Sequence, residues 1–470
     1  MNSRYSLLIK IVTLFVLVIV MLIPTRLIMG IVDDRFYYQN EVIESVSRSS
    51  SGEQTIVGPI IAIPYIETNI YYEDSKQIIK RTRNIHYILP KTLDVKAKVD
   101  VAPRYIGIYQ TQNYQSDLEF KGTFEATSFV HEENIELDEP YAVVLISDTR
   151  GIMQIPVMNI DQKTINFEPG IKENGFTTSS QLGGIHVPIS FKQLENSLSY
   201  NFSLKLQGMN RLAIVPVGQS TQYQLDANWP HPNFLGFSLP TKRQINEKGF
   251  SAEWQSTWYA NNINSLFAED SQISEERYKN KVCGSYVDSC MPMFKASFIE
   301  PVDQYQLTKR AIKYDILFTV LIFVSFFIFE ILKQIKIHPV QYLLVGMALA
   351  IFYLLLLAAS EHIGFTLAYI IGALACSILI GFYLSAVLKS IKWSCGFTVF
   401  LLTLYACLYI VMNSEGNSLL FGTTLLFLVL SGIMILTRHI DWYSVAKIDL
   451  NNIDKVTPIN EQSNTSPESN

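Results

Sequence analysis

The chain has 470 residues, of which 49% are hydrophobic, with a formal net charge of −5 and a mean hydropathy of +0.20. It carries no basic domain and no run of lysine or arginine, which argues against nucleic acid as a partner. Apolar residues gather at the N-terminus and in the C-terminal third, whereas the middle is polar. This split is typical of a membrane protein with one large soluble domain.

The first predicted element is a membrane-spanning helix in the apolar run over residues 7–23. The run exceeds the apolar core of about 7–15 residues found in signal peptides, and no small-x-small cleavage motif follows it. We therefore expect an uncleaved anchor over residues 1–30. Residues 26–47 are expected to extend the helix outward until the serines and glycine at 49–52 break it.

The middle of the chain, residues 31–310, predicts a β-rich extracytoplasmic domain. Over residues 94–101 the apolar Val95, Ala97, Val99 and Val101 alternate with charged residues. This period of two places one face of a strand in a core and the other in water. Similar patterns recur near residues 118–125, 202–207 and 223–227, which predicts antiparallel sheets or a sandwich.

Two features of this domain leave alternatives open. The segment Trp229-Pro230-His231-Pro232 is either a recognition loop, with Trp229 and His231 as contacts, or a rigid connection at a sheet edge. Cys283 and Cys290 are a candidate disulfide because an oxidising periplasm favours such bonds, and the alternative is two unpaired thiols.

The C-terminal third predicts five more membrane spans. Each is close to the roughly 20 apolar residues that a bilayer requires. They occupy residues 316–332, 343–359, 363–388, 394–412 and 419–436. The fold class is thus a membrane α-helical bundle of six transmembrane helices plus the β-rich domain. The five-helix part is bounded at 311–443, and a polar cytoplasmic tail, partly disordered, fills 444–470.

Loop charges predict the orientation. With the N-terminus inside, every short inside segment carries lysine or arginine, whereas the two short outside turns carry neither. Both termini are then cytoplasmic and residues 24–315 are periplasmic. The chain is expected in a bacterial inner membrane as a multi-pass protein.

Ionisable and aromatic residues at the span ends are the remaining candidates. Glu361 and His362 occupy a tight outer turn, which either binds a ligand or is a polar turn. Asp441 and Trp442 follow the last span and are expected as interfacial anchors. Glu330 lies one turn before Lys333, which predicts an ion pair.

The sequence lacks the common catalytic signatures. No P-loop glycine motif, His-Glu-x-x-His motif or Gly-x-Ser-x-Gly elbow occurs in the sequence. We therefore predict no catalytic residue, no cofactor and no metal site.

The sequence resembles CreD, an inner-membrane protein family of Gram-negative bacteria. The resemblance rests on the run His338-Pro339-Val340-Gln341-Tyr342-Leu343-Leu344-Val345-Gly346, on Ser360-Glu361-His362-Ile363-Gly364-Phe365, and on the closing Thr437-Arg438-His439-Ile440-Asp441-Trp442-Tyr443. In the middle domain the matching positions include Gln54, Gly58-Pro59, Ser147-Asp148, Arg150-Gly151-Ile152 and Trp229-Pro230-His231-Pro232. It covers nearly the whole chain. The outer turn Ser414-Glu415-Gly416-Asn417 departs from the Glu-Asp more usual in the family.

The resemblance implies a role in cell-envelope integrity and in the envelope-stress response, with no established catalytic activity. The leading hypothesis is a non-enzymatic protein that binds an envelope lipid, a glycan or cell-wall component, or an envelope protein through its outer domain. A transporter or lipid-handling protein is the alternative, and an envelope-acting enzyme is the third.

Overall fold

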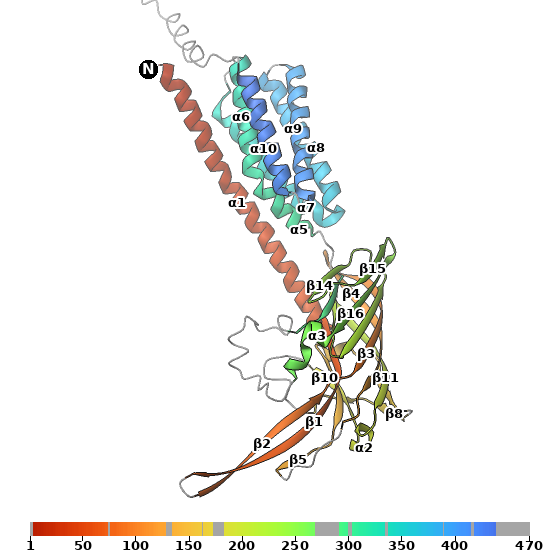
Figure 1. The fold of residues 1–470 in the computed structure, drawn as a ribbon. Helices are drawn as coiled ribbons and strands as arrows, with labels where there is room; N and C mark the ends of the chain where they lie inside the picture. The colour runs from red at the N-terminus through yellow and green to blue at the C-terminus, as the bar shows by residue number, and fades with distance from the viewer. Residues whose placement is uncertain are drawn as a thin grey trace, which may run out of the picture. The chain divides into compact units, whose positions relative to one another are not determined.

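The computed structural model describes residues 3–73, 76–127, 134–161, 163–172, 183–267, 291–298, 303–333, 337–388, 390–414 and 418–438 (Figure 1). The chain divides into two compact units. The membrane unit contains Met1–Tyr38 and Val302–Asn470, and the β unit contains Gln39–Pro301. Each unit is described by itself.

Helix α1 (Ser3–Ser49) is one continuous helix of 47 residues. It has Pro24 in its interior and ends where the predicted breaker, the serine and glycine run at 49–52, begins. The prediction that residues 26–47 extend the first helix is therefore confirmed. At 1.5 Å per residue this length exceeds what a bilayer requires.

The rest of the membrane unit is helical. Its helices are α5 (Gln304–Lys313), α6 (Asp315–Lys333), α7 (Pro339–Ile363), α8 (Phe365–Leu388), α9 (Ile391–Asn413) and α10 (Ser418–Thr437). Helix α7 begins with a capping box, in which His338 is the N-cap and Gln341 returns to the cap backbone. Pro339 takes the first helical position, where its missing N–H costs nothing.

Four helices, α1, α7, α8 and α9, are long and apolar enough to cross a membrane. Helices α5 and α6 form a fifth candidate if they act as one span, since they meet at a bend of 43°. Over the described residues, α10 offers only a shorter apolar stretch at 420–432. Several apolar helices of sufficient length are therefore confirmed, whereas six membrane spans stay a prediction.

The β unit contains two sheets. The first has the order β14-β17-β12-β1-β6-β10-β9, with β2 and β5 paired to β1 outside this path. Its strands are β1 (Gln54–Glu73), β2 (Lys76–Ile88), β5 (Ile135–Leu137), β6 (Tyr141–Ile146), β9 (Glu168–Pro169), β10 (Gly183–Pro188), β12 (Arg211–Val215), β14 (Asn233–Gly236) and β17 (Phe294–Ser297).

The second sheet has the order β15-β16-β13-β3-β4-β11-β7-β8. Its strands are β3 (Thr92–Ile106), β4 (Tyr109–Phe124), β7 (Val157–Ile160), β8 (Lys163–Asn166), β11 (Leu198–Met209), β13 (Ser220–Ala227), β15 (Lys242–Asn246) and β16 (Gly249–Thr257). Short helical turns complete the unit: η1 (Thr149–Gly151), α2 (Phe191–Leu194), α3 (Trp258–Asn261) and η3 (Ile263–Leu266).

Most strand pairs are antiparallel, as predicted, but β1 pairs with β12 and β13 pairs with β3 in parallel. The predicted alternation over residues 94–101 is confirmed, because charged and buried residues alternate along β3. The inner faces of the two sheets share one core. In it Phe294 of the first sheet stacks on Tyr223 and Trp254 of the second.

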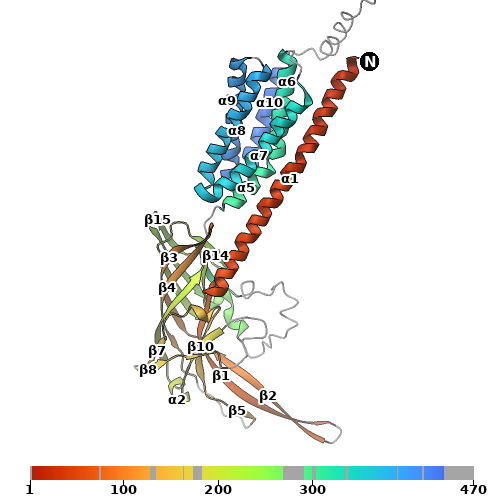
Figure 2. The same ribbon diagram turned by 180° about the vertical axis from the view of Figure 1, so that it is seen from behind.

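Strands β1 and β2 form a hairpin that projects from the β unit as a long two-stranded arm (Figures 1 and 2). Near its tip the side chains of Ile70, Tyr72 and Ile79 are exposed, Tyr72 to 75%. These residues lie outside the shared core, so the fold of the sheets does not depend on them.

Candidate functional site

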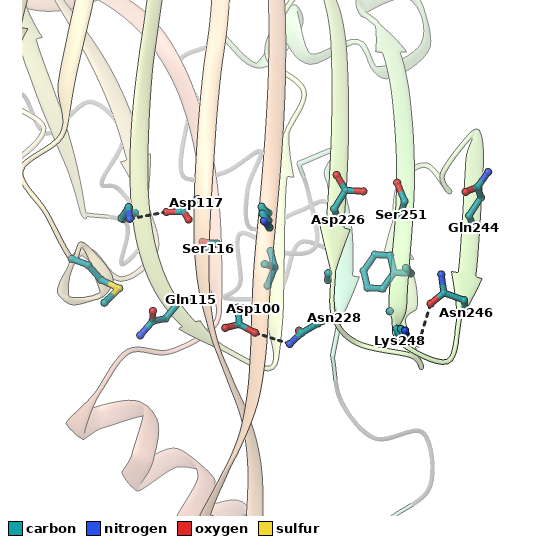
Figure 3. A pocket seen from close by; sticks show the side chains of 17 residues that line it. Asp100, Gln115, Ser116, Asp117, Asp226, Asn228, Gln244, Asn246, Lys248 and Ser251 are labelled. Atoms are coloured by element: carbon teal, nitrogen blue, oxygen red, sulfur yellow. Dashed lines mark hydrogen bonds and ion pairs between the residues drawn. The ribbon is translucent and has the colours of Figure 1, made fainter.

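A groove of about 700 Å³ crosses the outer face of the second sheet (Figure 3). Alternation within each strand directs charged and amide side chains to this face. The exposed polar lining comes from six strands and their loops: Lys98, Asp100, Gln115, Asp117, Lys205, Asp226, Asn228, Gln244, Asn246, Lys248 and Ser251.

Strand register places charges of opposite sign side by side in the groove. Lys205 of β11 faces Asp117 of β4, and Asp117 faces Lys98 of β3. Lys98 in turn faces Asp226 of β13. Lys205 Nζ lies 3.4 Å from Asp117 Oδ1, which is an ion pair between half-exposed groups. The row therefore balances two cations against two anions.

Asn228 holds one rim of the groove in place. Its Nδ2 donates to Asp100 Oδ1 at 2.6 Å, and its Oδ1 accepts the N–H of Val101 at 2.7 Å. Met153, 49% exposed, is an apolar member of the lining. The alternating strands were predictable, but the groove was not, because it depends on which strands are neighbours and in what register.

The predicted residues Trp229 and His231 lie in one loop and bond to each other. Trp229 Nε1 donates to the carbonyl of His231 at 2.9 Å, and the two rings meet edge to face with centroids 6.5 Å apart. Trp229 is half-buried against the core, whereas His231 is exposed. The loop follows Asn228 directly, so it continues from the groove rim.

Glu361 and His362 end helix α7 in the membrane unit. The side chain of Glu361 is 10% exposed, accepts from the hydroxyl of Tyr305 at 3.0 Å and lies 3.9 Å from Arg35 Nε. His362 is exposed. The turn therefore brings together α1, α5 and α7, a convergence that separated sequence segments do not reveal.

Glu330 is buried and binds Lys10 of α1, with Nζ and Oε1 2.8 Å apart. The hydroxyl of Tyr342 donates to Glu330 Oε2 at 3.1 Å, and the N–H of Ile337 donates to Oε1 at 3.2 Å. The predicted partner Lys333 has a side chain outside the described residues, so that pairing stays a prediction.

Asp315 is a buried carboxyl that the sequence reasoning missed. It opens α6 and is 3% exposed, although the predicted span began one residue later. The sequence did offer one indication of a functional role for Asp315. It directly precedes the apolar run at 316–332, and ionisable residues at membrane depth are usually functional.

The end of α1 is tied to the β unit by a side-chain network. Arg150 donates to the carbonyls of Ser47 and Arg48 at the last turn of α1, and it pairs with Asp148 at 2.6 Å. The N–H of Gly52 donates to Asp148 Oδ2 at 3.0 Å. Gln54 adds bonds to the backbone of Asp148.

This network lowers the pKa of Asp148. Burial alone would raise the pKa, but hydrogen bonds from the Arg150 side chain, the Gly52 N–H and the Arg150 N–H outweigh it. Asp148 is thus held as a carboxylate that joins the helix end to β1.

Some predicted residues cannot be placed. Cys283, Cys290, Asp441 and Trp442 lie outside the described residues. Within the described ranges, no group of three or more histidine, cysteine, aspartate or glutamate side chains is arranged to hold a metal ion.

Comparison with known proteins decides the family. The family profile described as "Inner membrane protein CreD" matches residues 6–443. The chain belongs to the CreD family. The inner membrane protein CreD of Escherichia coli strain K12 is 40% identical over 438 residues, covering 93% of each chain. The CreD resemblance inferred from the sequence is therefore confirmed, and the chain is an inner-membrane protein.

Solved structures add no argument for CreD. A candidate nutrient binding protein of Legionella pneumophila aligns with a TM-score of 0.23 and 6% identity, over 47% of this chain and 72% of that chain. An M1 zinc metallopeptidase of Deinococcus radiodurans aligns with a TM-score of 0.18 and 8% identity, over 36% and 39%. Both likenesses are too weak to support a common fold or function.

Proposed function

We propose that this CreD-family protein maintains the cell envelope by binding a glycan strand of the cell wall in the groove of the second sheet. The observation that carries the proposal is the row of balanced charges from Lys205 to Asp226 on the groove floor. In this proposal the β unit is periplasmic, and the membrane unit is its anchor.

The chemistry of the groove favours a polar polymer of low net charge. Lys98 and Lys205 offer N–H donors, Asp117 and Asp226 offer acceptors, and the amide of Asn228 offers both. Sugar hydroxyls and acetamido groups match such a mixed set, whereas an anionic or cationic polymer would meet like charges. An open groove also suits a strand that continues beyond both ends.

An ordinary solvent-facing sheet is the alternative interpretation of these charges, because cross-strand ion pairs stabilise sheets by a few tenths of a kcal/mol each, up to about 1. The two interpretations differ in where on the sheet the charge pairs must lie. A stabilising pair acts equally well anywhere on the sheet face, whereas a binding pair must line the groove. Strands β3 and β4 carry facing pairs of both kinds: Lys98 with Asp117 lines the groove, and Asp94 with Lys121 lies outside it.

The experiment measures co-sedimentation of the full-length protein, reconstituted in nanodiscs, with purified peptidoglycan sacculi. The groove variant is Lys98→Ala with Asp117→Ala, and the control is Asp94→Ala with Lys121→Ala, a facing pair on the same strands outside the groove lining. We expect the groove variant to bind at least about tenfold more weakly, roughly 1.4 kcal/mol, and the control to bind like the native protein.

Two outcomes would contradict the proposal. Native protein that stays in the supernatant shows no affinity for the sacculi. Equal binding by the groove variant and the control moves binding away from the groove. Neither variant changes the net charge, so a general electrostatic effect is not mistaken for binding.

A second candidate function, transport or lipid handling, is favoured by the buried Glu361 where three helices of the membrane unit converge. Its test is the envelope sensitivity of cells that carry Glu361→Gln or His362→Ala at normal protein levels. Unchanged sensitivity in both strains would remove this turn from any transport role.

A further inference from the structure

Among the described residues of the membrane unit, three carboxyls are buried or nearly buried, and each lies close to a side chain of α1. Glu330 binds Lys10 at 2.8 Å, and Glu361 lies 3.9 Å from Arg35. Asp315 differs from both. Among the described residues its partners are hydroxyl groups, from Thr25 of α1, Thr319 of α6 and Tyr353 of α7.

The lack of a cation beside Asp315 has a physical consequence. A carboxylate in a poorly solvated interior needs an opposite charge or several strong donors, otherwise its ionised form is costly. Asp315 is 3% exposed, and Tyr353, the titratable group that faces it, is neutral. Beyond Tyr353 the nearest interacting titratable groups are Tyr369 and Cys376 of α8, which bring no positive charge.

The start of α6 offers Asp315 less than a basic side chain would. Free N–H groups at a helix N-terminus stabilise an anion, and Asp315 is the first residue of α6. The charge at a helix N-terminus is, however, only about half an elementary charge. Lys10 beside Glu330 carries a full one.

The geometry at Thr25 fits a proton on Asp315. Thr25 Oγ1 lies 2.9 Å from the carbonyl of Met21 and 2.5 Å from Asp315 Oδ2. A threonine hydroxyl has one proton to donate and accepts through its lone pairs. If that proton goes to Met21, the contact with Asp315 is a hydrogen bond only when Oδ2 is protonated and donates to Thr25.

We propose that Asp315 is a proton-binding site of the membrane unit, and that its proton bonds α6 to α1 through Thr25. The protonated carboxyl donates from Oδ2, Oδ1 accepts from Thr319, and the hydroxyl of Tyr353 also bonds to the carboxyl. When the O–H bond breaks, the proton leaves to water, and an unpaired carboxylate stays behind. The Thr25 hydroxyl can then donate its proton to the carbonyl of Met21 or to the carboxylate of Asp315, but not fully to both. The contact between α1 and α6 therefore depends on the proton of Asp315.

The first measurement is infrared spectroscopy of the full-length protein at pH 7 in a detergent that has no ester or carboxyl group. A protonated carboxyl has a carbonyl stretching band separate from those of carboxylates and amides. We expect that band in the native protein and its loss in Asp315→Asn, a neutral side chain of the same shape. Glu330→Gln and Glu361→Gln are the matched controls, and both should keep the band.

A second variant tests the partner of the proton and remains informative if Asp315→Asn does not fold. Thr25→Val keeps the shape of the side chain and removes the acceptor, so the carbonyl band should persist and shift to higher wavenumber. Absence of the band from the native protein, its persistence in Asp315→Asn, or an unshifted band in Thr25→Val would each overturn the proposal.

Discussion

At the scale of single residues, the buried carboxyls of the membrane unit have two kinds of partner. Glu330 and Glu361 lie beside basic side chains of α1, whereas Asp315 meets only hydroxyl groups among the described residues. In the β unit, Asp148 accepts several hydrogen bonds and stays ionised. The partners of each carboxyl therefore decide its chemical role.

The pair of Lys10 and Glu330 gives a first prediction. Lys10→Met leaves Glu330 buried without its cation, so the unfolding midpoint of the purified protein should fall. The cost should be on the order of 1–2 kcal/mol, because Lys10 itself is half-exposed. Adding Glu330→Gln should recover most of the loss. A double variant as unstable as Lys10→Met would contradict this account of the pair.

The second prediction concerns pH at the end of α1. Because the pKa of Asp148 is lowered in the folded protein, its stabilising effect is complete above its unfolded value of about 3.9 and is lost as pH falls through the lower folded value. Hydrogen exchange at the Gly52 amide, corrected for intrinsic rates, should lose protection on acidification. In Asp148→Asn the protection at Gly52 should already be low at pH 7 and change little with pH.

At the scale of elements, small residues decide how closely the membrane helices approach. The small residues Ala368, Gly372 and Cys376 of α8 are buried, and a Cβ at Gly372 would lie 3.2 Å from Phe352 of α7. Gly346 of α7 plays the same part toward α1, since a Cβ there would meet the Met21 sulfur at 2.5 Å.

Gly346→Val is the third prediction. The added methyl groups must displace Met21 or Phe323, so the unfolding midpoint should fall by the equivalent of about 1–3 kcal/mol. Gly396→Val in α9 is the matched control, because it places the same side chain in a helix with nothing within 4 Å. Equal thermal shifts in the two variants would show that only helix propensity had changed.

At the scale of the whole molecule, one continuous helix belongs to both units. The first part of α1 carries Lys10, Thr25 and Arg35, which contact the bundle, and its last turn is held by Arg150. Residues of α1 therefore contribute contacts within each of the two units.

The fourth prediction tests the six-span topology with both termini inside. Alkaline phosphatase fused after Ser414 should be active and a fluorescent protein there should be dark, because that turn is expected outside. Fusions after Lys455 should give the reverse. If both positions report the same side, α10 does not cross the membrane, and the protein has five spans.

The sequence alone determined the family, the division into apolar and polar regions, and the strands with alternating residues. These features depend on local composition and periodicity, which can be read from neighbouring residues without knowledge of the fold. The helix break at Ser49 and the buried face of β3 followed from the same local signals.

Only the tertiary structure decided the contents of the two candidate sites. The groove exists because β11, β4, β3 and β13 lie in one register, which brings Lys205 beside Asp117 although they are distant in sequence. Asp315 is distinctive because its contact with α1 is a hydroxyl, that of Thr25. Glu330 and Glu361 instead meet basic side chains of α1, Lys10 and Arg35. Such pairings depend on which distant residues the fold brings within a few ångströms, and local patterns carry no information about them.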